Sequence, residues 1–169
     1  MDAVQTVPLR EGTRRLTRRG VDAREKILTA MVRCIGQFGY AGTTVEHVMA
    51  ETGLSRGSVL HQFRNRIELT VATAEYTMQF AMSDTRRRAE AIADPFERVA
   101  SYAQTMWETQ SQPEGVALSD ILLATRWDEE LAAAIRPITD WVEAEVSAEL
   151  LKLATDAGFA DPAAFVPHG

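Results

Sequence analysis

The side chains best suited to recognising a partner through hydrogen bonds or charge are concentrated in one short segment: Ser55, Arg56, Gly57, Ser58, His61 and Gln62. An arginine can donate two parallel hydrogen bonds to a guanine edge, and a glutamine or histidine can contact a base or a phosphate. Inside a helix Gly57 would cost about 1 kcal/mol relative to alanine, which indicates that something approaches the backbone closely there. The segment favours contact with nucleic acid, although His61 could instead be an ordinary surface histidine.

Two short helices are expected to position this segment. Ser55 is a suitable N-cap for the helix that carries it, and Gly53 can adopt the left-handed conformation of a tight turn just before that helix. Thr43 is the predicted N-cap of the preceding helix, with Glu46 three residues later. A pair of helices joined in this way is a helix-turn-helix, which places its second helix in the major groove of DNA.

Two further residues are predicted to hold phosphate groups. Thr44 and Arg66 stand at the starts of the helices before and after the recognition helix. Helix N-termini carry unpaired N–H groups and a partial positive charge, which suits a phosphate. The alternatives are that Thr44 is a simple cap and that Arg66 is a solvated surface charge.

A first helix is predicted from an N-cap at Asp22 to a stop at Gly39, because apolar residues recur at helical spacing between them. Three short helices can then share one small core, to which we assign Ile27, Met31, Phe38, Val45, Val48, Met49, Val59 and Phe63. We place this helix-turn-helix domain at residues 21–66.

The rest of the chain is also predicted to be helical, over residues 67–169. A long helix covers 66–92, one helix follows the restart at Asp94-Pro95, a loop spans 112–115, and another helix covers 116–126. The last helix starts after Asp128, is interrupted or kinked at Pro137 and stops at Gly158. No strand-like alternation, internal repeat or Gly/Ser linker is present, so the fold class is all-α.

The charge is divided unevenly along the chain. Residues 1–70 hold 11 basic and 7 acidic side chains, a net +4, whereas residues 71–169 hold 7 and 17, a net −10. Nucleic acid would therefore meet only the first part. Residues 1–20 are predicted to be a disordered leader that is either simply solvated or a basic arm along DNA, with Arg10, Arg14, Arg15, Arg18 and Arg19.

The sequence does not indicate an enzyme, a cofactor or a metal. Its three histidines, His47, His61 and His168, lack metal-ligand spacing with one another or with Cys34. No glycine-rich phosphate loop or nucleophile motif is present. The single cysteine suits a reducing cytoplasm, and no apolar run approaches the roughly 20 residues that span a bilayer. We therefore expect a cytoplasmic protein without a membrane partner.

Residues 22–70 combine several short motifs, namely Thr43-Thr44, Val48-Met49-Ala50, Gly53-Leu54-Ser55, Arg56-Gly57-Ser58, His61-Gln62-Phe63, Arg66 and Leu69. Through these motifs the sequence resembles the TetR family of transcriptional repressors. The resemblance implies a repressor that binds a palindromic DNA operator as a homodimer and is released by a small-molecule effector. It also implies an effector pocket in the acidic half, where we select Tyr102, Met106, Trp107 and Trp127, the alternative being that they are ordinary core residues.

The chain departs from the family in two ways. Leu60 stands where family members usually carry a tyrosine that touches a backbone phosphate, and leucine cannot donate that hydrogen bond. Family members usually carry two more helices after a stretch like 156–159, so the body is expected to be short. Both departures favour the alternative function, a helical effector-binding or partner-binding protein with weakened or lost DNA binding.

Overall fold

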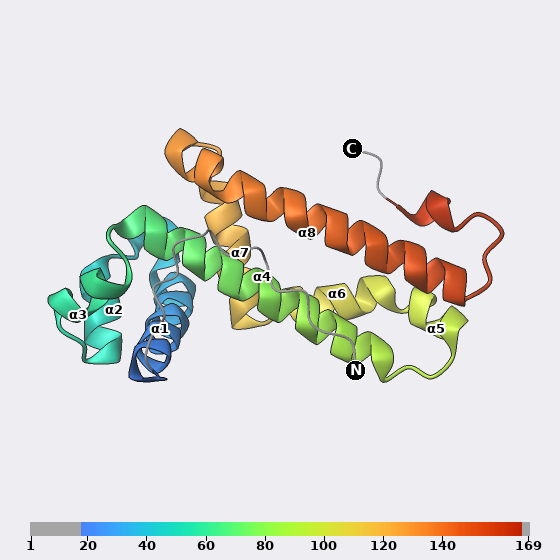
Figure 1. The fold of residues 1–169 in the computed structure, drawn as a ribbon, viewed down its shortest axis with the longest axis horizontal. Coiled ribbons are helices and arrows are strands. Elements are labelled where there is room, and N and C mark those ends of the chain that lie inside the picture. The colour runs from blue at the N-terminus through green and yellow to red at the C-terminus, as the bar shows by residue number, and fades with distance from the viewer. Residues whose placement is uncertain (1–17, 167–169) are drawn as a thin grey trace.

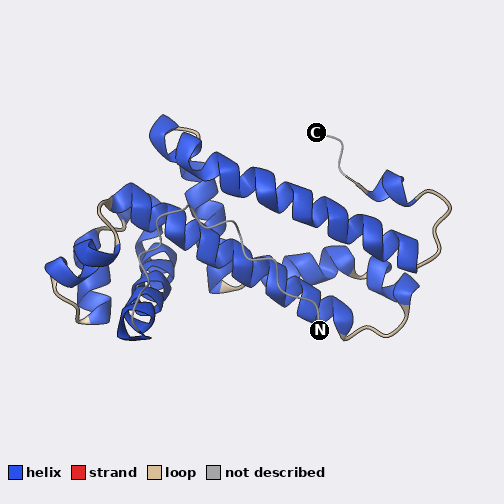
Figure 2. Ribbon diagram, in the orientation of Figure 1, coloured by secondary structure: helices blue, strands red, loops and turns tan. Residues whose placement is uncertain are grey.

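The computed structural model describes residues 18–166, with side chains from Gly20 onward, and every regular element in this range is helical (Figures 1 and 2). The elements are α1 Arg18–Gly42, α2 Val45–Thr52, α3 Arg56–Gln62, α4 Arg66–Glu90, α5 Pro95–Ala100, α6 Tyr102–Gln110, α7 Pro113–Ala124, α8 Glu129–Asp156 and the short 3-10 helix η1 Pro162–Phe165. The predicted all-α fold class is confirmed. Within the described residues, no helix combines the length and the apolar character needed to cross a bilayer.

The helices form a head at one end and an elongated body. Figure 1 shows α1, α2 and α3 together at one end, while α5 and η1 lie at the opposite end. Helix α4 runs from the head through the body and packs against α6, α7 and α8. Helix α7 also packs closely against α1, so it connects the body to the head. Most of the predicted leader, residues 1–17, lies outside the described residues, and 18–20 already belong to α1.

The head has the small shared core that the helical spacing predicts. Ile27 and Met31 from α1, Val48 from α2 and Val59 from α3 are almost fully buried, and Phe63 joins them just after α3. Each such side chain contributes roughly 1.5–3 kcal/mol by leaving water. The core therefore fixes the relative orientation of the two helices of the helix-turn-helix.

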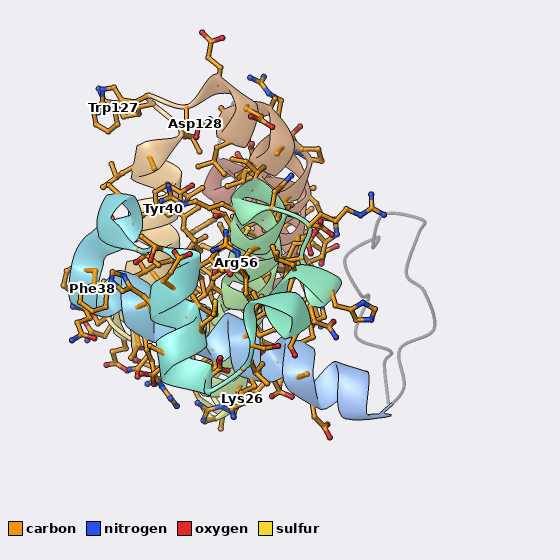
Figure 3. All side chains as sticks on the ribbon, turned by 90° about the vertical axis from the view of Figure 1, so that its left-hand side faces the viewer. Lys26, Phe38, Tyr40, Arg56, Trp127 and Asp128 are labelled. Atoms are coloured by element: carbon orange, nitrogen blue, oxygen red, sulfur yellow. The ribbon has the colours of Figure 1, made fainter. Side chains whose placement is uncertain are left out.

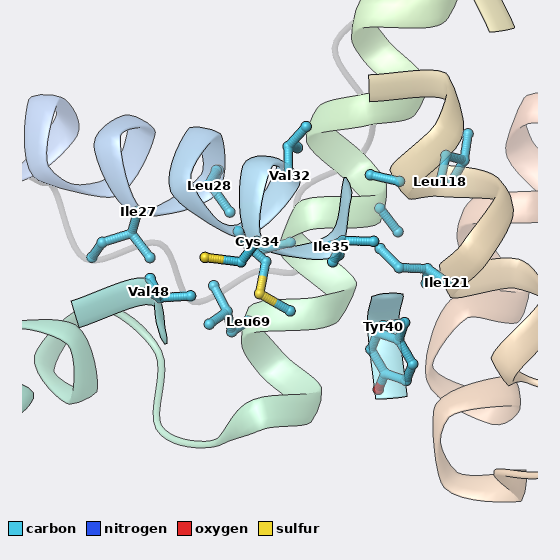
Figure 4. Packing of buried hydrophobic residues seen from close by; sticks show 14 of the residues in the cluster. Ile27, Leu28, Val32, Cys34, Ile35, Tyr40, Val48, Leu69, Leu118 and Ile121 are labelled. Atoms are coloured by element: carbon cyan, nitrogen blue, oxygen red, sulfur yellow. The ribbon is translucent and has the colours of Figure 1, made fainter. Parts of the chain in front are cut away.

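The same hydrophobic cluster continues into the body. Leu118 and Ile121 of α7 lie beside Ile35 and Tyr40 of α1 in the packed interior (Figure 4). One hydrophobic cluster therefore extends across the predicted domain boundary near residue 66. Helix α7 contributes part of the core in which the apolar side chains of α1 are buried.

The start and end of α1 differ from the prediction. The helix already includes Arg18, and Asp22 is an exposed residue inside it rather than its N-cap. Gly39 adopts a φ of 70°, which kinks the chain where the stop was expected, but a further helical turn follows as far as Gly42. Phe38, just before the kink, is 44% exposed rather than buried as predicted, and its ring stacks on His47 with 4.2 Å between centroids.

The N-cap of α2 is Thr44 and not Thr43. The Thr44 hydroxyl accepts a hydrogen bond from the His47 N–H at 3.3 Å. Thr43 is buried, and its hydroxyl donates to the Gly39 carbonyl at 2.7 Å. The kink at Gly39 releases that carbonyl from the regular helix ladder, so the first threonine is used to satisfy it and the second caps the helix.

Two boundaries in the body also differ from the prediction. The single helix expected after Asp94 is divided at Ser101 into α5 and α6. The expected loop over 112–115 belongs mostly to α7, which begins at Pro113, a residue suited to the first helical position. Gly115 lies where α7 crosses the end of α6, and a Cβ there would come within 2.7 Å of three backbone atoms of Gln110. The close crossing explains why glycine occurs inside a helix at this point.

The last helix follows the prediction at both ends. The Asp128 side chain accepts from the Leu131 N–H at 2.9 Å and caps α8. Helix α8 continues through Pro137 without ending, and Gly158, with a φ of 75°, follows its end.

A buried acidic side chain joins α4 to α6. Asp84 is ion-paired with Arg87 and, at 2.6 Å, with Arg88, and it accepts a hydrogen bond from the Thr109 hydroxyl at 3.0 Å. Burial alone would raise the pKa of Asp84, but these hydrogen bonds outweigh it and hold the pKa below its ordinary value. The carboxylate therefore stays charged and ties the two helices together.

Candidate nucleic-acid interface

The turn between α2 and α3 is held by local hydrogen bonds. Gly53 has a φ of 68°, and its N–H donates to the Met49 carbonyl at 2.8 Å. The Thr52 hydroxyl donates to the Val48 carbonyl at 2.7 Å and accepts from the Leu54 N–H at 3.2 Å. This arrangement confirms the predicted tight turn, which fixes the angle at which α3 leaves α2.

Helix α3 exposes to solvent most of the residues that are predicted to contact DNA. Ser55 caps it as predicted, accepting from the Ser58 N–H at 3.2 Å. Its apolar residues Val59 and Phe63 are 1% exposed and face the core. The exposed surface of the helix consists of Arg56, Gly57, Ser58, Leu60 and His61, while Gln62 is half-buried at its edge. The face turned outward is therefore mostly small, polar or basic.

No neighbour of Gly57 in the described part of the chain explains why this face carries a glycine. A Cβ built at Gly57 would meet only the Ser55 hydroxyl oxygen, at 3.9 Å, which is an ordinary contact distance. The backbone there is not in the left-handed region. Alanine would fit and would form the helix better, so no contact within the described residues calls for the glycine.

The arginine proposed to read a base is engaged with α2. Arg56 Nη1 lies 2.7 Å from Glu46 Oε1, and both side chains are more than half exposed. A hydrogen bond from its own backbone N–H and the charge of Arg56 hold the pKa of Glu46 below its ordinary value. Exposed ion pairs contribute about 0–1 kcal/mol, so a guanine edge or a phosphate can compete for Arg56 at small cost. Figure 3 shows Arg56 at the head end of the molecule.

The two predicted phosphate clamps differ in their surroundings. Thr44 is exposed, and its hydroxyl caps α2. Arg66 also contacts another part of the head, because its Nη2 donates to the Tyr40 carbonyl at 2.7 Å and its guanidinium lies 4.5 Å from the Tyr40 ring centroid. The Tyr40 N–H donates in turn to Asp120 Oδ2 on α7 at 2.5 Å. Tyr40 thus connects α1, α4 and α7, a role that no local sequence pattern indicated.

The described head carries little net charge of its own. Residues 20–70 hold six basic and five acidic side chains, a net +1. Residues 1–19 hold five basic and two acidic side chains, so they supply the remaining +3 of the +4 counted over residues 1–70. Any general attraction to phosphate therefore depends on the arginines of the leader.

The body contains a cavity of about 130 Å³ between α4, α6, α7 and α8. Two of the residues selected for an effector pocket, Tyr102 and Met106, line it. Trp107 is 70% exposed on the other side of α6, because one residue further along a helix turns a side chain by about 100°. Trp127 is 79% exposed in the connection between α7 and α8, and Figure 3 shows it pointing away from the body. Neither tryptophan lines the cavity.

The cavity residues that the sequence reading did not select come mainly from α4 and α8. Met78, Met82 and Thr85 recur at helical spacing on α4, a pattern that would have indicated one lined face. Among the described residues, no group of three histidine, cysteine, aspartate or glutamate side chains is placed to hold a metal ion.

The capped turn, the polar outer face of α3 and the helical body define a helix-turn-helix protein. Residues 27–73 match the family model described as bacterial regulatory proteins, tetR family. Residues 27–73 therefore form a domain of this family, which agrees with the resemblance found in residues 22–70. The matched relatives are transcriptional regulators, which agrees with the prediction that the protein is not an enzyme.

Two relatives illustrate how far the likeness extends. The HTH-type transcriptional repressor AcnR of Corynebacterium efficiens is 34% identical over 74 residues, which cover 44% of this chain and 36% of that protein. The HTH-type transcriptional repressor Rv1474c of Mycobacterium tuberculosis is 33% identical over 135 residues, which cover 79% of this chain and 63% of that protein. The chain thus spans only about a third of the length of AcnR.

A solved structure supports the fold beyond the head. The crystal structure of a protein from Mesorhizobium loti, described as a TetR-family transcriptional regulator, superposes with a TM-score of 0.62. The superposition covers 88% of this chain and 77% of the other, at 20% sequence identity. The arrangement of the body helices is therefore shared, although few of its residues are.

Proposed function

We propose that this protein is a DNA-binding transcriptional repressor that reads its operator with α3. The observation that carries the proposal is the outward face of α3, where Gly57 has no internal reason to be glycine and polar side chains surround it. The names of AcnR and Rv1474c as transcriptional repressors support the same function.

In this proposal the start of α3 enters the major groove. Arg56 leaves its ion pair with Glu46 and donates hydrogen bonds to a guanine edge. His61 and Gln62 contact a base or a phosphate. Ser55 and Ser58 lie on the same first turn, where the backbone N–H groups also point toward the groove. Thr44 and Arg66 contact phosphates on either side, and the leader follows the DNA backbone.

The operator would be a palindrome bound by a homodimer. Two copies of the head would enter successive major grooves, whose centres are roughly 34–36 Å apart on one face of DNA, and would block polymerase. A small-molecule effector in the body cavity would release DNA if it binds more tightly to the state in which the heads are wrongly spaced. This function requires a location with access to DNA, which is the predicted cytoplasm.

The experiment that tests the proposal is selection of bound sequences from a random DNA pool, followed by footprinting of the enriched DNA. An enriched palindrome supports a dimeric operator-binding repressor. An enriched single half-site supports the α3 assignment and removes the homodimer from the proposal. Absence of enrichment at low salt overturns the assignment of DNA as the partner.

A second function is favoured by two observations at the interface. Leu60 is 39% exposed on α3, where family members usually carry a phosphate-binding tyrosine, and Arg56 and Arg66 already have partners within the protein. A helical effector-binding or partner-binding protein with weak DNA binding would show these features. A salt titration separates the two, because each phosphate contact lowers the slope of log affinity against log salt by about 0.9.

A further inference from the structure

The body cavity has an apolar lining with a few charged groups on one side. Its apolar wall comes from all four helices around it: Met78 and Met82, Met106, Leu118, and Val142 and Val146. The Tyr102 side chain adds an aromatic ring. Three charged side chains complete the lining, Arg86 on α4 and the pair Glu145 and Glu149 on α8.

The charges of this lining do not cancel. Arg86 Nη2 lies 2.9 Å from Glu149 Oε2, so these two groups neutralise each other across the gap between α4 and α8. Glu145 lies one helical turn before Glu149 on the same side of α8 and is half-buried. No hydrogen bond or ion pair joins its carboxylate to another residue of the described chain. The lining therefore carries a net charge of −1.

The aromatic ring of the cavity lies in this negative environment. Burial raises the pKa of the Tyr102 hydroxyl, and the negative charge of Glu149 raises it further. The phenol therefore stays neutral, and Tyr102 contributes an uncharged aromatic side chain to the lining. The nearby Asp84 does not add to the negative charge, because Arg87 and Arg88 neutralise it.

We propose that the cavity binds a compact lipophilic monocation, an arylalkyl or alkyl ammonium, with its nitrogen at Glu145 and its apolar part among the methionines. The proposal rests on the proposed function in taking the cavity as the effector site. A half-buried carboxylate without a partner favours a ligand that brings a positive charge, and Tyr102 can add a cation–π contact. Methionine side chains adapt well to an aromatic ring.

The size and charge of the cavity argue against other ligand classes. A cavity near 150 Å³ accepts benzene, so about 130 Å³ has room for no more than a single ring. An anion would meet two carboxylates and only one guanidinium, which is already paired with Glu149. A neutral ligand would fill the apolar part and leave Glu145 without a partner.

The test compares three probes of one shape by isothermal titration calorimetry on the full chain: 2-phenylethylammonium, 2-phenylethanol and 3-phenylpropanoate. We expect the cation to bind at least about tenfold more tightly than the alcohol, with the anion weakest. Equal affinities, or a preference for the alcohol or the anion, would overturn the proposal.

Three variants locate the source of the preference. Glu145→Gln should reduce cation affinity to the level of the alcohol, while an unchanged alcohol affinity shows that the cavity is intact. Glu143→Gln removes the same charge from an exposed position of α8 and should leave the affinities for the cation and the alcohol unchanged. Arg86→Gln should strengthen cation binding, because it frees Glu149. Cation binding that survives in Glu145→Gln would contradict the assignment of Glu145.

A DNA-binding measurement keeps this inference separate from the proposed function. Cation binding without any enriched DNA would support the cavity assignment and overturn the repressor proposal. Enriched DNA without a preference for the cation would overturn the cavity assignment and leave the repressor proposal standing. Release of the enriched DNA by 2-phenylethylammonium, lost in Glu145→Gln, would support both.

Discussion

Replacing Gly57 with alanine should make the protein more stable and make it bind DNA less well. The added Cβ would touch only the Ser55 hydroxyl oxygen, at 3.9 Å, so no strain opposes it in the free protein. Alanine is better than glycine inside a helix by up to about 1 kcal/mol. Because Gly57 lies in the first turn of a short helix, we expect a gain of about 0.5–1 kcal/mol in the free energy of unfolding.

The effect on DNA binding should have the opposite sign. If the backbone of α3 lies against a base pair or a phosphate, the extra methyl group must push the two surfaces apart. Overpacking of a close contact costs about 1–3 kcal/mol, which corresponds to a loss of roughly 5-fold to 150-fold in affinity. A loss of affinity in a more stable protein cannot be attributed to unfolding.

The matched control is Gly36→Ala on α1. Gly36 is also exposed, and a Cβ there would meet nothing within 4 Å. Urea unfolding should show a similar gain in stability for both variants, and fluorescence anisotropy with the enriched DNA should show weaker binding only for Gly57→Ala. If Gly57→Ala is stabilised and binds as tightly as the wild type, the close approach of DNA to α3 is refuted.

Three further predictions concern single side chains. Arg56→Ala should weaken specific binding by about 1–3 kcal/mol and relax the preference at one base pair, measured by repeating the DNA selection. Arg33→Ala, which breaks a similar exposed ion pair in the head, should leave that preference unchanged. Gly115→Ala should lower the melting temperature, because its Cβ would lie within 2.7 Å of the Gln110 backbone, and an unchanged value would mean that α6 and α7 can separate. The lowered pKa of Asp84 means that its charged form stabilises the fold above the ordinary pKa of an aspartate and that this stability is lost as the pH falls. The difference in unfolding free energy between wild type and Asp84→Asn should therefore shrink below about pH 4, and a constant difference would contradict this reasoning.

The helix ends that depend on local chemistry were predictable from the sequence. Ser55, Asp94 and Asp128 each cap the expected helix, because a side-chain oxygen three residues before a backbone N–H needs no distant partner. Gly53 and Gly158 occupy left-handed positions next to helix ends for the same local reason.

The features that the sequence did not predict depend on a backbone kink, on packing or on residues far apart in the chain. Two adjacent threonines could each have capped α2, but the Thr43 hydroxyl donates to the Gly39 carbonyl at the kink, so Thr44 caps the helix. The sequence predicts a phosphate contact for Arg66 but not its hydrogen bond to the Tyr40 carbonyl, because Tyr40 is 26 residues away. The sequence groups Trp107 with Tyr102 and Met106 because they lie close together on one helix, but Trp107 is exposed on the outer side of α6.

The continuous core between α1 and α7 has a consequence for protein engineering and for the exchange of domains in evolution. A head excised at residue 66 would expose Ile35 to water and would deprive the Tyr40 N–H of its acceptor on Asp120. Such a fragment would be prone to aggregate, and a chimera that joins this head to a foreign body would inherit the same defect. A functional graft must carry α7 along with the head, or must rebuild both the apolar wall and the carboxylate that it provides.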